Sequence, residues 1–447
     1  MTATATEAGA PSEQASAPLV IVSCDTHIGP RLDPDLRPYC PPELLDDFDA
    51  YAGTLREKKE AAAAARGRIA FAGKQMGADW GVRTANLQTL GHYDMHARLN
   101  DLSGDGVAAE VMFHDSQNGE PIPFQTDTLL MRSANIPQDY AQLRAGQRIY
   151  NQWLADVCSI EPERHIGLMH LPMWDIDAAI EELTWGRSVG LKGVNFPTPK
   201  PHLLPYNAPD WDPFFAACED LGVTLCNHGG AAASGGAYPG AMSIAKFEIS
   251  MMARICPMDL LIFGGVFERH PGLRLVLTES PGNWWNFVLQ EMDSIYLTDT
   301  RSYGPSEKER VPRMPSEYAN EQVFVGASFH ARFEAEDAID KGYVDRIIWG
   351  SDYPHFEGTY QYDALGPNGE PMTWAALRFH YAGLPIEPVR SFLGGNAMHA
   401  YDLDYDALTK VAARINAPSY ADLNSAHVDE RPADSGHLSF RTFGFWA

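Results

Sequence analysis

The sequence lacks several features that would point to particular classes of protein. It has only six cysteines, with no CxxC pair and no regular spacing. A disulfide framework is therefore not expected, and scattered core thiols in a reducing cytoplasm are the simpler interpretation. No apolar run is long enough to cross a bilayer. Residues 1–17 contain no Lys or Arg and no apolar core, so they are interpreted as a disordered leader rather than a signal peptide.

Positive charge is also scarce. Lys and Arg number 34 against 59 Asp and Glu, which gives a net charge of −25. Nucleic acids and anionic membranes both select for clusters of Lys and Arg, so neither partner is expected. With 447 residues, of which 45% are hydrophobic and 21% charged, the chain is typical of a soluble globular protein. Its length suits one large barrel with insertions, or two ordinary domains. We expect a cytoplasmic location and a small-molecule substrate.

The sequence does contain a repeated alternation of short apolar runs with helix-like segments. This alternation is typical of β/α units, and runs that are apolar almost throughout indicate parallel strands buried on both faces. The predicted strands are Leu19–His27, Val107–His114, Ile166–Pro172, Leu191–Thr198, Gly222–Gly230, Leu273–Ser280, Gln322–Ser328 and Arg346–His355. The predicted helices are Asp139–Ser159, Ile176–Val189, Asp210–Leu221, Ile244–Arg254, Trp284–Leu297 and Ala335–Lys341. Eight such units predict an α/β fold, a distorted (β/α)8 TIM-like barrel.

Three segments exceed a minimal barrel, which is expected over residues 18–405. An insertion at about 38–100 includes a long predicted helix at Pro41–Arg68, interpreted as a solvated arm or as an arm that clasps a second subunit. A polar insertion at Asp299–Asn320 is predicted to be a lid. The tail, residues 406–447, ends in aromatic residues and is expected to pack on the barrel or on a partner subunit. A homodimer is the expected assembly, with a hetero-oligomer as the alternative.

Side chains with metal-binding chemistry stand at the carboxyl ends of three predicted strands. Asp25 and His27 are two residues apart on the first strand and therefore share a face. His228 ends the fifth strand, and Asp352 ends the eighth, which neighbours the first in a closed barrel. Buried carboxylates and imidazoles need a partner, and a bound cation satisfies both. Two of each kind suit Zn²⁺, which is expected first, or Mn²⁺ or Fe²⁺.

Several motifs in consistent order resemble the amidohydrolase-related family. They are DTH, HARLNDLSGDGVAAEVMF, ERHIGLMHLP, GLKGVNFPT, NHGG, ERHPGLRLVLTES, WGSDYPH and FLGGNAMHAYDLD, and they span most of Leu19–Asp404. The family includes aminocarboxymuconate semialdehyde, resorcylate and carboxyvanillate decarboxylases. The resemblance implies a barrel that holds one metal ion by a pair on strand one, a His on strand five and an Asp on strand eight. In this sequence these residues are Asp25, His27, His228 and Asp352.

The sequence departs from the family pattern at two positions. Many members carry H-x-H on the first strand, where this chain has Asp25 in first place. Decarboxylases of the family place a His at the end of the sixth strand as a proton donor, and this chain has Glu279 there. A buried Glu can transfer protons, or it can bind a second metal ion. The fourth strand ends in Asn195–Thr198 and offers no lysine for the dinuclear site of dihydroorotase-like relatives.

Four further side chains at the same rim are candidates for binding substrate. His114 and His170 end the second and third strands, the end of the barrel at which substrates bind. Trp284 is a candidate wall of an aromatic pocket. His355 follows Asp352 by three residues, so it either orients that carboxylate or contacts substrate.

Two reactions compete, and two other roles remain as alternatives. The first hypothesis is a metal-dependent hydrolase, in which the metal held by His228 and its partners lowers the pKa of a water toward about 7. Asp352 would accept the proton of that water and Glu279 would protonate the leaving group. The alternative is a non-oxidative decarboxylase (a carboxy-lyase) of an aromatic or unsaturated carboxylate. A dinuclear metal oxygenase that uses Glu279 and a non-catalytic subunit that binds a partner are the remaining alternatives.

Overall fold

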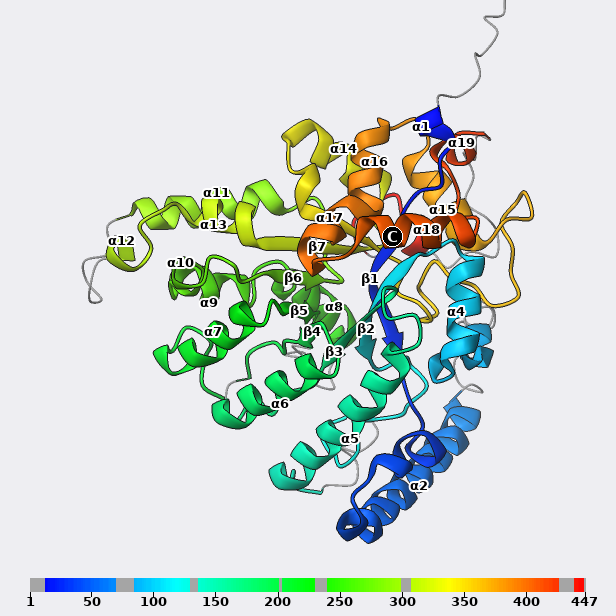
Figure 1. The fold of residues 1–447 in the computed structure, drawn as a ribbon, viewed down its shortest axis with the longest axis vertical. Coiled ribbons are helices and arrows are strands. Elements are labelled where there is room, and N and C mark those ends of the chain that lie inside the picture. Colours follow the sequence, from blue (N-terminus) through cyan, green and yellow to red (C-terminus); the bar gives the residue numbers. More distant parts are fainter. Residues whose placement is uncertain are drawn as a thin grey trace, which may run out of the picture.

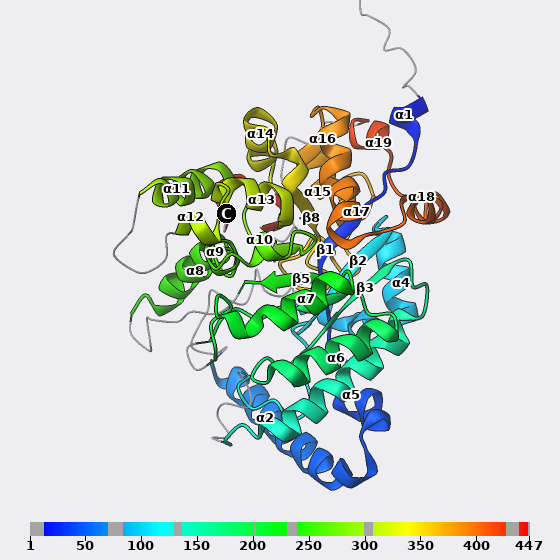
Figure 2. The same cartoon turned by 60° about the vertical axis from the view of Figure 1, so that its left-hand side comes forward.

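Eight parallel strands form the centre of the computed structural model, which describes residues 13–69, 84–128, 136–200, 203–229, 239–298, 307–425 and 438–445. The strands pair in chain order, each with the next. They are β1 (Val22–Ile28), β2 (Ala109–His114), β3 (His165–Met169), β4 (Gly193–Asn195), β5 (Thr224–His228), β6 (Leu275–Thr278), β7 (Val323–Ser328) and β8 (Ile347–Gly350). Helices surround these strands on the outside (Figures 1 and 2). The predicted (β/α)8 barrel is therefore confirmed.

The barrel closes between β1 and the residues that follow β8. The amide of Asp352 donates to the carbonyl of Asp25 over 2.8 Å, and the amide of His27 donates to the carbonyl of Tyr353 over 2.6 Å. Thr26 and Tyr353 form a parallel bridge at the same place. The backbone contacts that close the barrel thus also bring together the strand ends that carry candidate metal ligands.

The predicted helices are all present, with small shifts at their ends. They are α5 (Tyr140–Cys158), α6 (Ile176–Ser188), α7 (Asp212–Asp220), α8 (Ala241–Met252), α11 (Trp285–Leu297) and α14 (Arg332–Lys341). The carboxylates of Asp139 and Asp175 accept hydrogen bonds from amides of the first turns of α5 and α6, and these caps explain where the two helices begin. Helices that the sequence did not predict include α4 (Met95–Gly104), α9 (Met258–Phe263), α10 (Val266–Arg269), α15 (Met372–Tyr381), α16 (Ile386–Arg390) and α17 (Asn396–Tyr401).

The arm predicted after the first strand is a helix, α2 (Leu45–Ile69), at the lower edge of the molecule in Figure 1. The phenol of Tyr51 donates to the carbonyl of Gln125 over 2.6 Å, in the loop after β2. The buried ring of Phe48 meets that of Phe124 edge-on, with centroids 6.1 Å apart. The first half of the arm therefore packs on the barrel of its own chain.

The lid predicted at Asp299–Asn320 is wrong for residues 307–320. This stretch contains α12 (Glu307–Arg310) and α13 (Pro315–Gln322), and α13 packs on α9 and α11. The segment leads directly into the first residue of β7. The strands begin at the end of the barrel opposite the candidate site, so this segment lies at that opposite end. The side chain of Gln322 donates to the carbonyls of His270 and Leu273, which precede β6, so the end of α13 is attached to the amino-terminal end of the barrel. Residues 299–306 lie outside the described part.

The two chain ends differ in part from the predicted boundaries. Residues 13–16 form a helical turn, α1 (Glu13–Ser16), whose Gln14 carbonyl accepts a hydrogen bond from Arg390 over 2.7 Å. The predicted leader is therefore too long, and residues 1–12 lie outside the described part. At the other end, α18 (Tyr405–Arg414) buries Leu408 and Val411 in the barrel core, and α19 (Tyr420–Leu423) packs beside α1. The tail is thus continuous with the barrel up to residue 425.

All six cysteines are buried and free, as expected from their spacing. Among the described helices, none combines the length and the apolar character that a membrane span requires.

A fully buried ion pair fixes β1 to β2 and to α4. Arg98 of α4 donates to the carboxylate of Glu110 on β2, with an Nη2–Oε2 distance of 2.6 Å. The same guanidinium donates to the carbonyl of His27 over 2.7 Å and to the hydroxyl of Thr26 over 2.9 Å. Burial raises the pKa of Glu110, but the charge of Arg98 and hydrogen bonds from His165 and Arg98 outweigh it and lower that pKa. The ionised network therefore holds the backbone of a candidate metal ligand.

Replacing Arg98→Met should lower the free energy of unfolding by about 3–5 kcal/mol, because it leaves Glu110 charged and buried without its partner. The control Arg144→Met removes an exposed ion pair with Glu181 and should cost less than about 1 kcal/mol. Urea unfolding at pH 7 measures both values. Because the pKa of Glu110 is lowered, its stabilisation is present above the unfolded pKa of about 4.3 and is lost as the pH falls below it. Equal effects of the two substitutions would contradict this account.

Candidate metal centre

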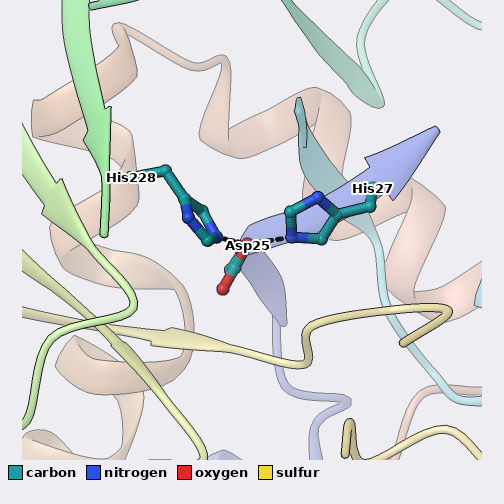
Figure 3. Close-up of side chains that lie close together, drawn as sticks. All are labelled: Asp25, His27 and His228. Atoms are coloured by element: carbon teal, nitrogen blue, oxygen red, sulfur yellow. Dashed lines mark ion pairs between the residues drawn. The ribbon is translucent and has the colours of Figure 1, made fainter. Parts of the chain in front are cut away.

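Four side chains from β1, β5 and the segment after β8 converge at the carboxyl end of the barrel. Oδ1 of Asp25 lies 3.2 Å from Nε2 of His27 and 3.5 Å from Nε2 of His228. Oδ1 of Asp352 lies 3.1 Å from Nε2 of His27. Figure 3 shows the carboxylate of Asp25 between the two imidazoles, with both ring nitrogens directed at it. The structure thus brings together the four side chains that the sequence nominated.

The atoms that face one another in this group are buried, and none has a hydrogen-bond partner in good geometry among the described residues, although they lie close to one another and to Nδ1 of His355. They are Oδ1 of Asp25, Nε2 of His27, Nε2 of His228 and both carboxylate oxygens of Asp352. Buried polar atoms in folded proteins nearly always have such a partner. A divalent cation satisfies imidazole nitrogens and carboxylate oxygens at the same time. The donor set therefore fits a metal ion of this kind.

The local structure of β1 and β7 directs Asp25 into the site. The pairing of β1 with β2 shifts register between Ser23 and Thr26, and the Ser23 hydroxyl donates to the carbonyl of Asp25 over 2.7 Å within this irregularity. The hydroxyl of Ser328, the last residue of β7, donates to Oδ2 of Asp25 over 2.5 Å. One carboxylate oxygen is thereby fixed by a hydrogen bond, and the other is left for the site.

The two imidazoles are oriented by contacts on their outer nitrogens. Nδ1 of His27 lies 3.2 Å from the carbonyl of His114, which favours a proton on Nδ1 and leaves Nε2 as a ligand atom. Nδ1 of His228 lies 3.7 Å from Oε2 of Glu279, so the carboxylate stands on the outer side of that ring. Metal-binding histidines in proteins usually have a carbonyl or carboxylate at this position.

His355 contacts two of the candidate ligands, His27 and Asp352. Its ring stacks on that of His27 with centroids 3.8 Å apart, and its Nδ1 lies 2.9 Å from Oδ1 of Asp352. Its Nε2 lies 2.7 Å from the carbonyl of Asp115. Burial lowers the pKa of His355, but the charge of Asp352 outweighs it and raises that pKa to about 10. Of the two roles considered for His355, these contacts favour orienting Asp352.

Two residues of the site have a backbone conformation that is unusual for residues other than glycine. Glu279, directly after β6, has φ of 54°, and Asp352, two residues after β8, has φ of 56°. Phe329, directly after β7, has φ of 56° as well. Left-handed conformations at such residues cost about 1–3 kcal/mol and persist only where the surroundings impose them. For Asp352, the hydrogen bond from its amide to the carbonyl of Asp25 is one such constraint.

Charge in the metal-free group is balanced by protons on the imidazoles. Burial lowers the pKa of His228, but the charge of Asp25 outweighs it and raises that pKa to about 9. Burial has the opposite sign for Asp25, whose pKa nevertheless falls well below its usual range because of His228 and His27. The shift of Glu279, beside His228, is in the opposite direction, because burial raises its pKa to about 7. A cation that binds here must replace the protons on its imidazole ligands.

His114 and His170 lie side by side at the neighbouring strand ends. Their ring centroids are 5.7 Å apart, and both rings pack edge-on against Tyr150 of α5, at 5.2 and 5.3 Å. Burial lowers the pKa of His114 to about 4 and that of His170 to about 3, so both are neutral at pH 7. Contact of these two residues with substrate stays a prediction.

The side chain of Trp284 packs against residues that are close to it in the sequence. It is buried, its indole nitrogen donates to the hydroxyl of Ser280 over 3.0 Å, and its ring packs against Trp285. These contacts give the indole a packing role, and an aromatic wall for substrate stays a prediction.

Sequence reasoning missed Ser328 and Asp115, which hold Asp25 and His355 in place. A signal for Ser328 was present, because it is the last residue of a predicted strand and therefore stands at the same rim as the ligands. Asp115 contributes only its backbone carbonyl, and the residue type does not predict which contacts a backbone carbonyl makes.

A β/α barrel whose carboxylates and imidazoles gather at the ends of β1, β5 and β8 is a metal-dependent amidohydrolase-type enzyme. The family model described as amidohydrolase matches residues 93–403, which is more than half of the chain. The protein therefore belongs to this amidohydrolase family.

Two curated relatives are decarboxylases. A 2-amino-3-carboxymuconate-6-semialdehyde decarboxylase of Dictyostelium discoideum is 29% identical over 194 residues, which is 43% of this chain and 49% of the relative. The matched stretch thus spans about half of that protein. A gamma-resorcylate decarboxylase of Rhodococcus jostii (strain RHA1) is 25% identical over 294 residues, which is 58% of this chain and 80% of the relative.

Solved structures show the same fold at lower identity. A 5-carboxyvanillate decarboxylase from Novosphingobium aromaticivorans with bound manganese has a TM-score of 0.56 at 18% identity and covers 88% of this chain and 99% of its own. A 2,6-dihydroxybenzoate decarboxylase from Rhizobium has a TM-score of 0.51 at 19% identity and covers 86% of this chain and 99% of its own.

Replacing His228→Ala should reduce bound metal from one ion per chain to less than about a tenth of that in dialysed protein, because an imidazole ligand is lost. The fold should persist, since His228 ends a strand at the rim. The control His399→Ala removes an exposed imidazole of α17 and should leave the metal content unchanged. Elemental analysis with circular dichroism checks both variants. Full metal occupancy in the His228 variant would remove this residue from the ligand set.

Proposed function

We propose that this amidohydrolase-family protein is a metal-dependent, non-oxidative decarboxylase of an aromatic or unsaturated carboxylate. The observation that carries the proposal is the convergence of two carboxylates and two imidazoles whose facing atoms are buried and have no other hydrogen-bond partner in good geometry among the described residues, with Glu279 beside His228. Both curated relatives named above are decarboxylases, which favours this reaction over the hydrolysis that we first expected.

We propose that Asp25, His27, His228 and Asp352 hold a single divalent ion. When bound, the ion supplies positive charge that neutralises the carboxylate and a neighbouring oxygen of the substrate. Two carboxylates and two imidazoles suit Zn²⁺, our first expectation, and suit Mn²⁺ as well. Mn²⁺ gains support from the manganese in the carboxyvanillate decarboxylase with this fold.

Glu279 is the proton donor in this proposal. Its carboxyl group stands at the end of β6, on the same rim of the barrel as the four candidate ligands, with Oε2 3.7 Å from Nδ1 of His228. The bond between the substrate carbon and its carboxylate breaks, CO₂ leaves, and the electron pair stays on the carbon. The carboxyl proton of Glu279 then passes to that carbon, and the resulting carboxylate takes a new proton from water. A Glu thus replaces the His that family decarboxylases use at this position.

The second candidate function is a metal-dependent hydrolase, and the burial of the Asp352 carboxylate supports it. Oδ1 of Asp352 lies close to His27 and His355, whereas its buried Oδ2 has no hydrogen-bond partner among the described residues and could accept a proton from an attacking water. Glu279 would then protonate the leaving group. A second metal ion bound by Glu279 is the third arrangement, and it would favour oxygenase chemistry.

We also propose that His114 and His170 contact the substrate, because they are neutral and stand at the same end of the barrel. A cytoplasmic homodimer that acts on a small molecule is the setting in which we place the enzyme. Native mass in solution tests the dimer independently of the reaction.

Replacing Glu279→Gln should lower kcat by roughly 10²–10⁴-fold with one metal ion retained, because the side chain keeps its shape and loses its transferable proton. The control Glu291→Gln changes an exposed residue of the nearby helix α11 and should leave kcat unchanged. A panel of hydroxybenzoates and unsaturated dicarboxylates serves as substrate, with CO₂ release and metal content as the measurements. A fall from two metal ions to one would indicate the second-metal arrangement, and product without CO₂ would indicate the hydrolase.

A further inference from the structure

Five residues of the segment 438–445 are buried beside the loops that carry the candidate metal site, whereas residues 442–444 are exposed. Residues 438–445, here called the C-terminal strap, follow twelve residues that lie outside the described part. Phe440 is 0% and Arg441 1% exposed, and Leu438 and Phe445 are buried as well. Chain ends are ordinarily exposed unless specific contacts hold them. The contacts of the strap therefore need an explanation.

Arg441 attaches the strap to the loop after β7. Its Nε donates to the carbonyl of Phe329 over 2.9 Å, and its Nη2 forms an ion pair with Glu334, both side chains being fully buried. Phe329 has the left-handed backbone noted above and directly follows Ser328, whose hydroxyl fixes Asp25. The guanidinium thus binds the carbonyl of a strained residue that adjoins an anchor of the metal site.

Ser439 attaches the strap to the loop after β8. Its hydroxyl lies 2.6 Å from the carbonyl of Gly358, as donor to acceptor, and its own carbonyl lies 2.9 Å from Nε2 of His380. Gly358 is pressed against the site, because a Cβ atom there would lie 2.7 Å from the carbonyl of Asp352 and 3.0 Å from that of His355. Its amide donates to the carbonyl of His355 over 3.0 Å. The hydrogen bond from Ser439 therefore acts on a residue that packs directly against the backbone of Asp352.

Apolar packing alone does not account for these contacts. Phe440 packs among Met372, Ala375 and Ala376, and that packing would anchor the strap without any polar group. Burying a guanidinium and a carboxylate costs free energy that their mutual attraction only partly offsets. Such groups are retained where they fix a particular geometry, and here both polar contacts end on loops of the site.

We propose that the C-terminal strap positions the metal site, with Arg441 and Ser439 as positioning residues that hold the β7 and β8 loops. This inference rests on the proposed metal site and assigns to it residues far away in the sequence. By fixing Phe329 and Gly358, the strap holds Asp25 and Asp352 at the spacing a cation requires. Loss of such outer contacts typically weakens metal binding by about 10–100-fold.

The first test is Ser439→Ala in the full-length chain, which removes one hydroxyl and leaves the apolar packing in place. The Kd of the metal-free protein for Mn²⁺ should rise by about 10-fold, with Tm nearly unchanged. Hydrogen exchange at the amides of Gly358 and Thr359 should accelerate in the metal-free protein. The control Ser425→Ala removes an exposed hydroxyl that bonds a backbone carbonyl over 2.8 Å, and it should change neither quantity.

The second test is the double substitution Arg441→Met with Glu334→Gln, which avoids leaving one buried charge unpaired. The Kd for Mn²⁺ should again rise by about 10-fold or more. Should this variant fail to fold, Ser439→Ala decides alone. A lower Tm with an unchanged Kd and unchanged exchange would reduce the strap to a stabilising element and overturn the proposal, as would wild-type behaviour in both variants. Failure of the wild-type protein to bind Mn²⁺ or Zn²⁺ would instead overturn the metal site itself, and the positioning role with it.

Discussion

Two carboxylates and two imidazoles meet at the mouth of the barrel, where three nitrogen–oxygen contacts of 3.1–3.5 Å connect them, and the surrounding structure holds them there. Oδ1 of Asp25 approaches His27 and His228, and Asp352 approaches His27 from the next strand end. Carboxylates this close repel each other unless positive charge lies between them. Protons on the imidazoles can supply it, and a divalent ion held by these side chains, as we propose, would supply it in their place. The constraint thus links the fold of the barrel to its chemistry.

Residues around the four candidate ligands hold the ligand side chains in place. Ser328 fixes Asp25, and His355 braces Asp352 while stacking on His27. Arg98 binds the carbonyl of His27 from outside the barrel. Glu279 and Asp352 have left-handed backbones, so the energetic cost of the site is spread over the strand ends that form it. The C-terminal strap extends the same arrangement to the loops after β7 and β8.

The barrel and the gathering of Asp25, His27, His228 and Asp352 could be predicted from the sequence, because both depend on short-range patterns. Apolar runs mark strands, and polar residues at their carboxyl ends must meet once parallel strands close.

The supporting contacts could not be predicted in the same way. Arg441 meets Glu334 across more than a hundred residues, and Arg98 meets Glu110 between a helix and a strand. Neither pair has a spacing that a local pattern could reveal. The lid prediction was wrong for residues 307–320 because a polar, proline-containing stretch is compatible with a loop and also with a short helix that starts at a proline, as α13 does. Residue type alone does not distinguish the two.

The location of a bound ion tests the central claim most directly. Crystals of the full-length protein grown with Mn²⁺ would give an anomalous signal whose position is independent of any activity. The account predicts one peak per chain, within bonding distance of Asp25, His27, His228 and Asp352. A second peak, within bonding distance of Glu279, would contradict the single-ion arrangement. No peak among these four side chains, in protein that is folded and supplied with Mn²⁺, would contradict the account as a whole.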